Sequence, residues 1–319
     1  MNLTVTSSPH IRGNDSTKRI MRDVNLALTP ALLFGIAHFG LRAAAVTAVC
    51  ILFALVTELA CNKWIFRDHR ELDGSAFVTG MLLAMTLPST VPYWLAAVGA
   101  VFAILVVKAL CGGLGQNIFN PALAARAFMV LIYPVGMVRY FGVNGWFGGV
   151  DAVSSSTPLH HMVMPALPEQ SVLDMFLGNT SGSIGEVSAL LLLLGGAYLV
   201  WKRVISLRIP AAYLGTVAVL TLVFHKTDNA LLWMAYQLVS GGVVLGAIFM
   251  ATDYATSPVT PVGQIVYGVG CGVLTVLFRY FGIFPEGVTY AILIMNGLSW
   301  AIDRATAPVR YGMKKGGAV

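Results

Sequence analysis

The residues best suited to chemistry in this sequence form one hydroxyl-rich run, in which Asp151 is followed by Ser154, Ser155, Ser156 and Thr157. Such hydroxyls donate and accept hydrogen bonds, so the run is suited to bind a polar group such as phosphate outside the hydrocarbon. We predict no catalytic residues within the chain. The competing interpretation is an unmodified polar turn, because Ser and Thr readily bond nearby backbone groups.

Other redox or metal chemistry fits the sequence poorly. The four cysteines form no Cys-x-x-Cys pair and stand in or beside apolar segments, so we predict no metal or iron–sulfur site. Only His38 and His225 stand at the ends of apolar segments, and neither has an evident partner for a haem. No Gly-x-Gly-x-x-Gly follows a strand-like run, which argues against direct NADH oxidation by this chain.

Four acidic residues near apolar segments are candidates for ion handling, because a charge there is costly. They are Glu58, Asp253, Glu286 and Asp303. Asp253 stands in the broken stretch 251–258, where free carbonyls and hydroxyls could coordinate Na⁺. The alternative for Asp253 is a turn residue on the cytoplasmic side, and we expect Asp303 to form an interfacial charge pair with Arg304.

The elements that position these residues must lie in a membrane. Of 319 residues, 57% are hydrophobic and 11% are charged, whereas about 25% of a soluble domain is charged. The net charge of +6 is spread over short connections rather than gathered in one patch. This pattern indicates membrane orientation and argues against nucleic acid as a partner.

We predict an all-α membrane protein of about ten transmembrane helices, some of them short or broken by Pro and Gly. Short or broken helices are tolerated where protein shields their backbone or where they line a cavity. The predicted segments lie near 24–40, 42–60, 76–88, 93–110, 120–134, 184–201, 209–225, 230–250, 263–281 and 286–302.

Lysine and arginine accumulate on alternate connections, which the positive-inside rule places in the cytoplasm. Lys108 counts among these cytoplasmic charges, and Arg279 is one of the few basic residues on the other side. Both termini are therefore predicted inside, and the loop with Thr157 outside. The resulting divisions are a cytoplasmic arm (1–23), a first five-helix repeat (24–134), an extracytoplasmic loop (135–183), a second five-helix repeat (184–302) and a cytoplasmic tail (303–319).

The two halves of the chain show a weak internal similarity. Residues 79–88 resemble residues 245–252 with the following Ser257-Pro258, and residues 118–122 resemble residues 283–287. Because five segments per half is an odd number, a duplication would be inverted. Inverted repeats with broken helices are typical of transporters, which place their functional groups near the repeat interface. Chance placement of Gly and Pro is the alternative.

The pattern Asp151-x-x-Ser154-x-Ser156-Thr157 resembles the flavinylation motif of the Rnf and Nqr membrane flavoproteins. Stretches 113–122, 251–261 and 284–304 also look like signatures of that family, so the resemblance covers most of the chain. The family unites the RnfD component of Rnf electron transport complexes and the NqrB component of Na⁺-translocating NADH:quinone reductases. Ser155 stands where the motif usually has glycine.

The resemblance implies FMN bound covalently through a phosphodiester to Thr157, attached by a separate flavin transferase. Asp151 would repel the phosphate, so recognition by the transferase or capping of a turn suits it better. The resemblance also implies a second, non-covalent flavin such as riboflavin within the bundle. It places the chain in the bacterial inner membrane, in contact with lipid.

The implied function is electron relay within an Rnf-type complex that couples ferredoxin and NAD to Na⁺ or H⁺ translocation. The implied partners are other Rnf subunits, including a second covalent-FMN subunit and membrane iron–sulfur subunits. One alternative is the quinone-reducing NqrB component of the related reductase, whose longer N-terminal region this chain lacks. A second alternative is a non-redox channel or transporter built from inverted repeats, which would leave Thr157 unmodified.

Overall fold

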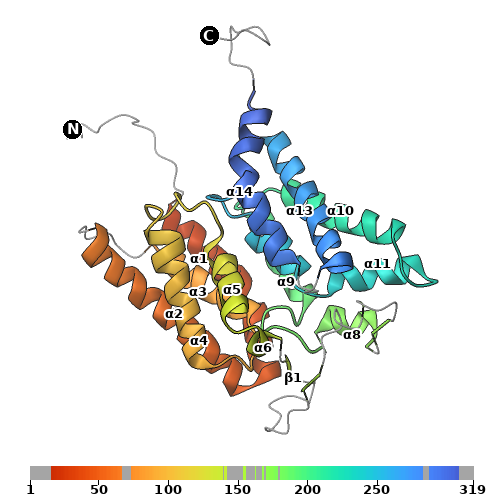
Figure 1. Ribbon diagram of the computed structural model, residues 1–319, viewed down its shortest axis with the longest axis horizontal. Coiled ribbons are helices and arrows are strands. Elements are labelled where there is room, and N and C mark those ends of the chain that lie inside the picture. Colours follow the sequence, from red (N-terminus) through yellow and green to blue (C-terminus); the bar gives the residue numbers. More distant parts are fainter. Residues whose placement is uncertain are drawn as a thin grey trace, which may run out of the picture.

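The computed structural model is predominantly helical (Figure 1). It describes residues 16–66, 73–138, 140–141, 154–155, 162, 167–168, 170–178, 180–282 and 287–308. The first half contains α1 (Thr17–Phe39), α2 (Leu41–Cys61), η1 (Asn62–Phe66), α3 (Ser75–Thr86), α4 (Tyr93–Phe102), η2 (Ala103–Ala109), α5 (Pro121–Ile132) and α6 (Pro134–Met137). Then follow β1 (Tyr140–Phe141), β2 (Ser154–Ser155), α8 (Val172–Leu177), α9 (Ala189–Trp201), α10 (Arg208–Val223), α11 (Ala230–Val239), α12 (Val243–Leu245), η3 (Gly246–Met250), α13 (Pro261–Phe281) and α14 (Val288–Thr306). The η segments are π-helical and continue the α-helices that precede them.

The local sequence explains where two important helices begin. The Asn120 side chain accepts the N–H groups of residues 122 and 123, and Pro121 takes the first position of α5. Thr260 and Pro261 start α13 in the same way, with the threonine hydroxyl accepting the N–H of residue 263. A polar cap followed by proline is a favoured helix start, because proline lacks the N–H that would otherwise need a partner.

Three helices among the described residues are long and apolar enough to cross a membrane, namely Thr17–Phe39, Leu41–Phe66 and Pro261–Phe281. The pair Ala230–Val239 and Val243–Met250 passes the same test together, with a bend of 63° at its break. Several other apolar helices have 10–17 residues, and a full span needs about 20. The chain is thus a multi-pass membrane protein, and the count of ten spans remains a prediction.

The two halves of the chain lie side by side in Figure 1, with red to yellow elements on one side and cyan to blue elements on the other. In the first half, α2 packs against α3 and α4; in the second, α10 packs against α11 and α13. Contacts between α1 and α9 and between α5 and α14 join the halves. This similar packing suits a repeated unit, whereas the inversion between the halves remains a prediction.

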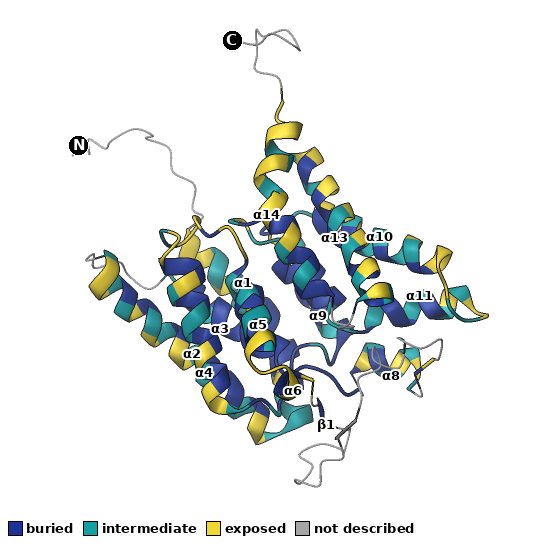
Figure 2. Cartoon of the chain, viewed as in Figure 1, coloured by how far each residue is buried: buried dark blue, intermediate teal, exposed yellow. Residues whose placement is uncertain are grey.

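Each half contributes one short helix that is enclosed by the rest of the protein. All residues of α3 except Phe77 are buried (Figure 2). Every residue of α12 and η3 is buried as well. At 12 residues and 1.5 Å per residue, α3 is about 18 Å long, which is too short for a bilayer. Short helices whose ends lie inside the protein provide polar backbone groups at membrane depth.

A buried segment without regular structure, residues 180–188, caps the end of α3; we call it the strap. The Ile184 N–H donates to the Leu87 carbonyl at 3.0 Å, and the Gly185 N–H donates to the Met85 carbonyl at 2.8 Å. These bonds satisfy carbonyls that a helix end leaves without partners. The strap therefore binds the end of α3 through residues far along the chain.

Gly185→Ala is expected to destabilise the protein by about 1–3 kcal/mol, as overpacking commonly does. A Cβ at residue 185 would lie 2.4 Å from the Met85 Cβ and 2.9 Å from the Met85 carbonyl oxygen. The control is Gly215→Ala on α10, where nothing lies within 4 Å of the new Cβ, so alanine should be neutral or stabilising. Thermal unfolding in detergent measures both, and equal midpoints for the two variants would contradict the expectation.

Candidate functional site

The covalent flavin site predicted from the sequence falls in the segment between α6 and α8. Thr157, Ser156 and Asp151 are outside the described residues. The backbone of Ser154 and Ser155 forms β2, which pairs antiparallel with β1 so that Tyr140 lies opposite Ser155 and Phe141 opposite Ser154. Thr157 is two residues beyond this pair, and two residues of chain span at most about 7 Å. The described strand pair therefore ends two residues before Thr157.

The β1 strand is anchored in the protein through Tyr140, which is buried and hydrogen-bonded to Arg126 on α5. The Arg126 guanidinium is 3.7 Å from a carboxylate oxygen of Glu186 in the strap, and both side chains are at most 10% exposed. Burial raises the pKa of Tyr140 above its ordinary value, so its hydroxyl stays protonated and can act as a donor. One side of the predicted flavin loop is therefore fixed by a buried polar group.

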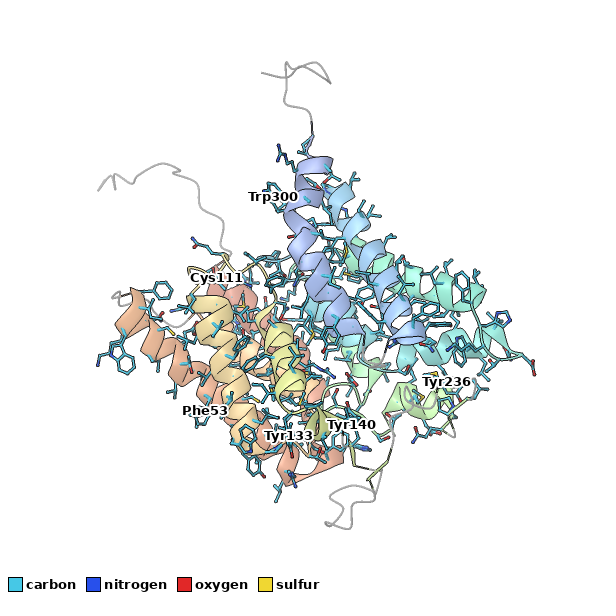
Figure 3. The ribbon with its side chains drawn as sticks, in the orientation of Figure 1. Phe53, Cys111, Tyr133, Tyr140, Tyr236 and Trp300 are labelled. Atoms are coloured by element: carbon cyan, nitrogen blue, oxygen red, sulfur yellow. The ribbon has the colours of Figure 1, made fainter. Side chains whose placement is uncertain are left out.

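The other side of the loop is anchored by Met162, which is 2% exposed. Met162 belongs to a small buried cluster with Met175 of α8 and with Trp233 and Tyr236 of α11. Figure 3 labels Tyr140 and Tyr236, which both lie at the end of the molecule opposite Trp300. Both anchors of the loop are thus at one end of the helix bundle.

Arg279 is a buried basic residue that sequence reasoning placed among the outer loop charges. It lies inside α13 and is 4% exposed. Its guanidinium donates to the Gln237 carbonyl at 2.5 Å, to the Gln237 side-chain oxygen at 2.9 Å and to the Ser240 carbonyl at 2.7 Å. These carbonyls end α11, so a cation is well placed there by charge as well as by hydrogen bonding.

Away from this loop, the molecule contains a cavity of about 100 Å³ lined by residues from both halves of the chain. Asn117, Asn120 and Asp253 line it together with hydroxyls and apolar side chains. Asn120 also joins the halves, because its amide donates to the Met250 carbonyl at 3.2 Å. An apolar cavity with a few converging polar groups is the usual form of a small-molecule site.

Asp253 lies in the link between η3 and α13, as the sequence predicted. Burial raises the pKa of its carboxyl, while hydrogen bonds from Ala255 N–H, Thr256 and Asn117 oppose this shift. The carboxyl therefore binds a proton more tightly in the folded protein than in the unfolded chain.

The raised pKa of Asp253 predicts a specific pH dependence of stability. The folded protein holds more protons than the unfolded chain between the ordinary and the raised pKa, so stability falls as pH rises through this window. Each tenfold difference in proton affinity between the two states corresponds to a loss of about 1.4 kcal/mol. Asp253→Asn is expected to remove this pH-dependent part of the stability, because asparagine does not titrate but keeps an acceptor oxygen. Unfolding midpoints measured across the acidic range test the prediction. If the midpoint changes with pH in the variant as it does in the parent, the prediction is wrong.

A second polar group that the sequence did not reveal joins α2, α3 and η2. Lys108, predicted as a cytoplasmic loop charge, is instead buried and forms an ion pair with Glu58. The lysine also donates to the Ser75 hydroxyl at 2.5 Å, and Ser75 hydrogen-bonds Asp73. Sequence reasoning missed the pair because its members are 50 residues apart and a basic residue at the end of an apolar segment usually faces the membrane surface.

Asp303 also differs from its prediction. Instead of pairing with Arg304, its carboxylate accepts the N–H groups of Val259 and Thr260, at 3.0 and 3.2 Å respectively. These groups lie at the start of α13, where a negative charge is favourable. Within the part of the chain that the structure describes, no three His, Cys, Asp or Glu side chains form a metal-binding group.

Comparison with known proteins identifies the family. The model of the NQR2, RnfD, RnfE family matches residues 4–312. The chain is 46% identical to the D subunit of the Na(+)-translocating ferredoxin:NAD(+) oxidoreductase complex of Acetobacterium woodii, over 99% of this chain and 97% of the relative. It is 43% identical to the D subunit of the proton-translocating ferredoxin:NAD(+) oxidoreductase complex of Clostridium ljungdahlii, over 98% and 97%. It is 38% identical to the D subunit of the ion-translocating oxidoreductase complex of Stutzerimonas stutzeri, over 93% and 92%.

These matches extend over nearly the whole chain and over nearly the whole length of each relative. They include the polar loop as well as the helices on both sides of it. The chain belongs to the NQR2, RnfD, RnfE family.

Proposed function

We propose that this chain is a membrane subunit of an Rnf-type ferredoxin:NAD⁺ oxidoreductase complex and relays electrons through FMN attached covalently to Thr157. The observation that carries the proposal is the flavinylation-type motif ending at Thr157, in a chain similar throughout to the D subunits of such complexes. The chain acts only within the complex. The soluble nucleotide sites and the iron–sulfur clusters belong to its partners.

The arrangement around the loop supports this role. A flavin that transfers electrons to a partner needs a fixed position, because transfer depends steeply on distance. The β1–β2 pairing holds the chain on one side of Thr157, and buried Met162 holds it on the other. Ser154, Ser155 and Ser156 are the motif neighbours that could hydrogen-bond the phosphate of the attached FMN.

The orientation follows from charge. We infer that the protein lies in a bacterial inner membrane with both termini in the cytoplasm and the Thr157 loop in the periplasm. Burial of Lys108 and Arg279 removes one basic residue from each side of the predicted count. The remaining clusters, in the first two turns of α1, after α2, between α9 and α10 and at and beyond the end of α14, still place an excess on one side.

The cavity lined by Asn117, Asn120 and Asp253 supports a second, non-covalent flavin such as riboflavin. The pyrimidine edge of an isoalloxazine ring carries an N–H donor between two carbonyl acceptors. An amide and a carboxyl can complement such an edge, and the apolar walls suit its flat rings. The polar groups present suit the ring edge, while the cavity of about 100 Å³ is smaller than the ring system and must widen to admit it.

The coupled ion is Na⁺ or H⁺. Relatives at 46% and 43% identity are named for Na⁺ and for protons respectively, so overall similarity does not separate the two. The specificity must depend on a small number of residues. Among the described residues, Asp253 is the candidate for ion specificity. Its carboxyl lines the cavity of about 100 Å³ and can hold either a proton or a cation.

Intact mass of the chain, purified from cells that also contain the flavin transferase, tests the proposal. The mass is expected to exceed that of the sequence by one FMN minus water, with flavin fluorescence on a denaturing gel. An unmodified, colourless chain would favour the non-redox channel. Reduction of quinone by the purified complex, blocked by quinone analogues, would favour the quinone-reductase component.

A further inference from the structure

The turn after α9 holds an arginine in a backbone conformation that favours glycine. Arg203 has φ +59°, and it is the only residue other than glycine with a positive φ in the described part of the chain. Its N–H donates to the Val200 carbonyl at 2.9 Å, and the Val204 N–H donates to the Leu199 carbonyl at the same distance. Helices that end in this pattern usually have glycine at the position of Arg203. Because backbone strain of this kind persists mostly at functional sites, the arginine side chain calls for an explanation.

The same turn forms part of a groove of about 440 Å³, a volume typical of small-molecule sites. Arg203 lines the groove together with apolar side chains of the turn, with the link after η3 and with Gln264 of α13. None of the described residues that line it is acidic. Val204 and Tyr254 also line the cavity of about 100 Å³, and the Tyr254 hydroxyl donates to the Val204 carbonyl within this shared wall. The groove is therefore a separate site with a positive charge.

The groove lies where the helix bundle meets the membrane surface. It adjoins the end of α9 and the starts of α10 and α13. Trp201, in the last turn of α9, is 77% exposed, and exposed tryptophans at helix ends lie at the level of lipid headgroups. Leu207 in the groove is exposed, as are Val262 and Ile265, which flank Gln264 on α13. Apolar surface for acyl chains therefore continues from the groove.

The polar groups of the groove divide into a charged donor and two acceptors. The Arg203 side chain forms no ion pair or hydrogen bond with the described residues, so its guanidinium can bind a phosphate. The Ser206 hydroxyl donates to the Gln264 side-chain oxygen at 3.0 Å, and the Ser257 hydroxyl donates to the Asp253 carbonyl at 2.7 Å. Since each hydroxyl has one proton, both are left as acceptors. This set suits a phosphate that carries hydroxyl groups of its own.

We propose that the groove binds the headgroup of an anionic phospholipid whose phosphate carries a glycerol. Arg203 donates to the phosphate, and Ser206 and Ser257 accept hydrogen bonds from the glycerol hydroxyls. The acyl chains lie along the exposed apolar side chains at the start of α13. Basic residues at a membrane surface attract anionic lipids, whereas a choline headgroup has no hydrogen-bond donor for the serines. The site is independent of the flavin at Thr157.

Native mass spectrometry of the full chain, washed free of lipid in detergent, measures the Kd of the first bound phosphatidylglycerol. Arg203→Gly removes the donor and places the favoured residue at the helix end. Its binding is expected to be at least about tenfold weaker, the effect of losing a hydrogen bond to a charged group. Its unfolding midpoint without lipid should stay the same or rise, so the weaker binding does not reflect a damaged fold. Arg203→Lys keeps the charge and should retain most of the binding.

Gln264→Glu is a second test in another element. It keeps the side-chain oxygen that Ser206 and Arg208 bind and adds a negative charge to the groove, so phosphatidylglycerol should bind more weakly. Lys202→Gln is the matched control. It removes one positive charge beside Arg203 but outside the groove, where the ammonium lies 5.4 Å from the centre of the Trp201 ring. This variant should bind phosphatidylglycerol as the parent does.

The choice of lipid tests the chemistry of the headgroup. The parent should bind phosphatidylglycerol more tightly than phosphatidylcholine, and more tightly than phosphatidylethanol, which has the same charge but no headgroup hydroxyl. Equal binding of phosphatidylethanol would overturn the role of Ser206 and Ser257. Unchanged binding in Arg203→Gly, or displacement of the lipid by millimolar inorganic phosphate, would overturn the lipid site. Loss of a partner subunit from the Arg203→Gly complex, with lipid binding unchanged, would assign the groove to a protein contact instead.

Discussion

Thr157→Ala is expected to abolish covalent flavin completely, as seen by the loss of the FMN mass increment and of in-gel fluorescence. The physical reason is that the phosphodiester needs a hydroxyl at the last position of the motif, and alanine has none. Because a linked phosphate cannot dissociate, a variant without the link should also lose FMN during purification. Electron transfer from ferredoxin to NAD⁺ by the assembled complex should fall with it.

Two further substitutions, one at Thr157 itself and one at Ser155, provide controls for this result. Thr157→Ser keeps a hydroxyl and should retain at least part of the modification. Ser155→Gly restores the residue that the motif usually has at this position and should be flavinylated at least as well as the parent. Retention of FMN in Thr157→Ala, with the mass increment moved to Ser156 or to another residue, would contradict the assignment.

Lys108→Met is expected to lower the free energy of unfolding by about 3–5 kcal/mol, because it leaves Glu58 as an uncompensated buried charge. The two side chains are only 8% and 9% exposed, so water cannot readily replace the lost partner. The second carboxylate oxygen of Glu58 already has no hydrogen-bond partner in the structure, which increases the dependence on Lys108. Thermal and chemical unfolding of the purified protein in detergent measures the change.

A double variant distinguishes pairing from simple loss of packing. Lys108→Met with Glu58→Gln removes both charges and should recover a large part of the lost stability. Lys202→Met, at an exposed position, should change stability by less than about 0.5 kcal/mol. If the double variant is as unstable as the sum of the two single variants, the ion pair does not explain the effect of Lys108.

The sequence predicted those parts of the fold that depend on local pattern. Apolar runs placed most helices, and the predicted segment near 120–134 begins where α5 begins, whereas the segment near 230–250 was predicted without the break that separates α11 from α12. The family resemblance is confirmed over residues 4–312. These features depend on periodicity and on backbone preferences of single residues, which a sequence displays directly.

The features that the sequence could not predict are pairings between distant segments. Lys108 and Arg279 were both counted as surface charges, and each proves to be buried against a partner on another helix. A basic residue at the end of an apolar run gives the same pattern whether it faces lipid headgroups or enters the protein. Asp303 likewise binds the backbone of residues 259 and 260 rather than its neighbour Arg304.

The strap also has a consequence for biosynthesis. Its residues 184 and 185 bond the carbonyls of Leu87 and Met85, so the end of α3 lacks these partners until the ribosome has made about a hundred further residues. Carbonyls without partners are costly at membrane depth. The amino-terminal half therefore cannot reach its final state while it is being inserted. Maturation of the first half must wait for translation of the segment that follows the loop with Thr157, which makes this protein assemble as one body rather than half by half.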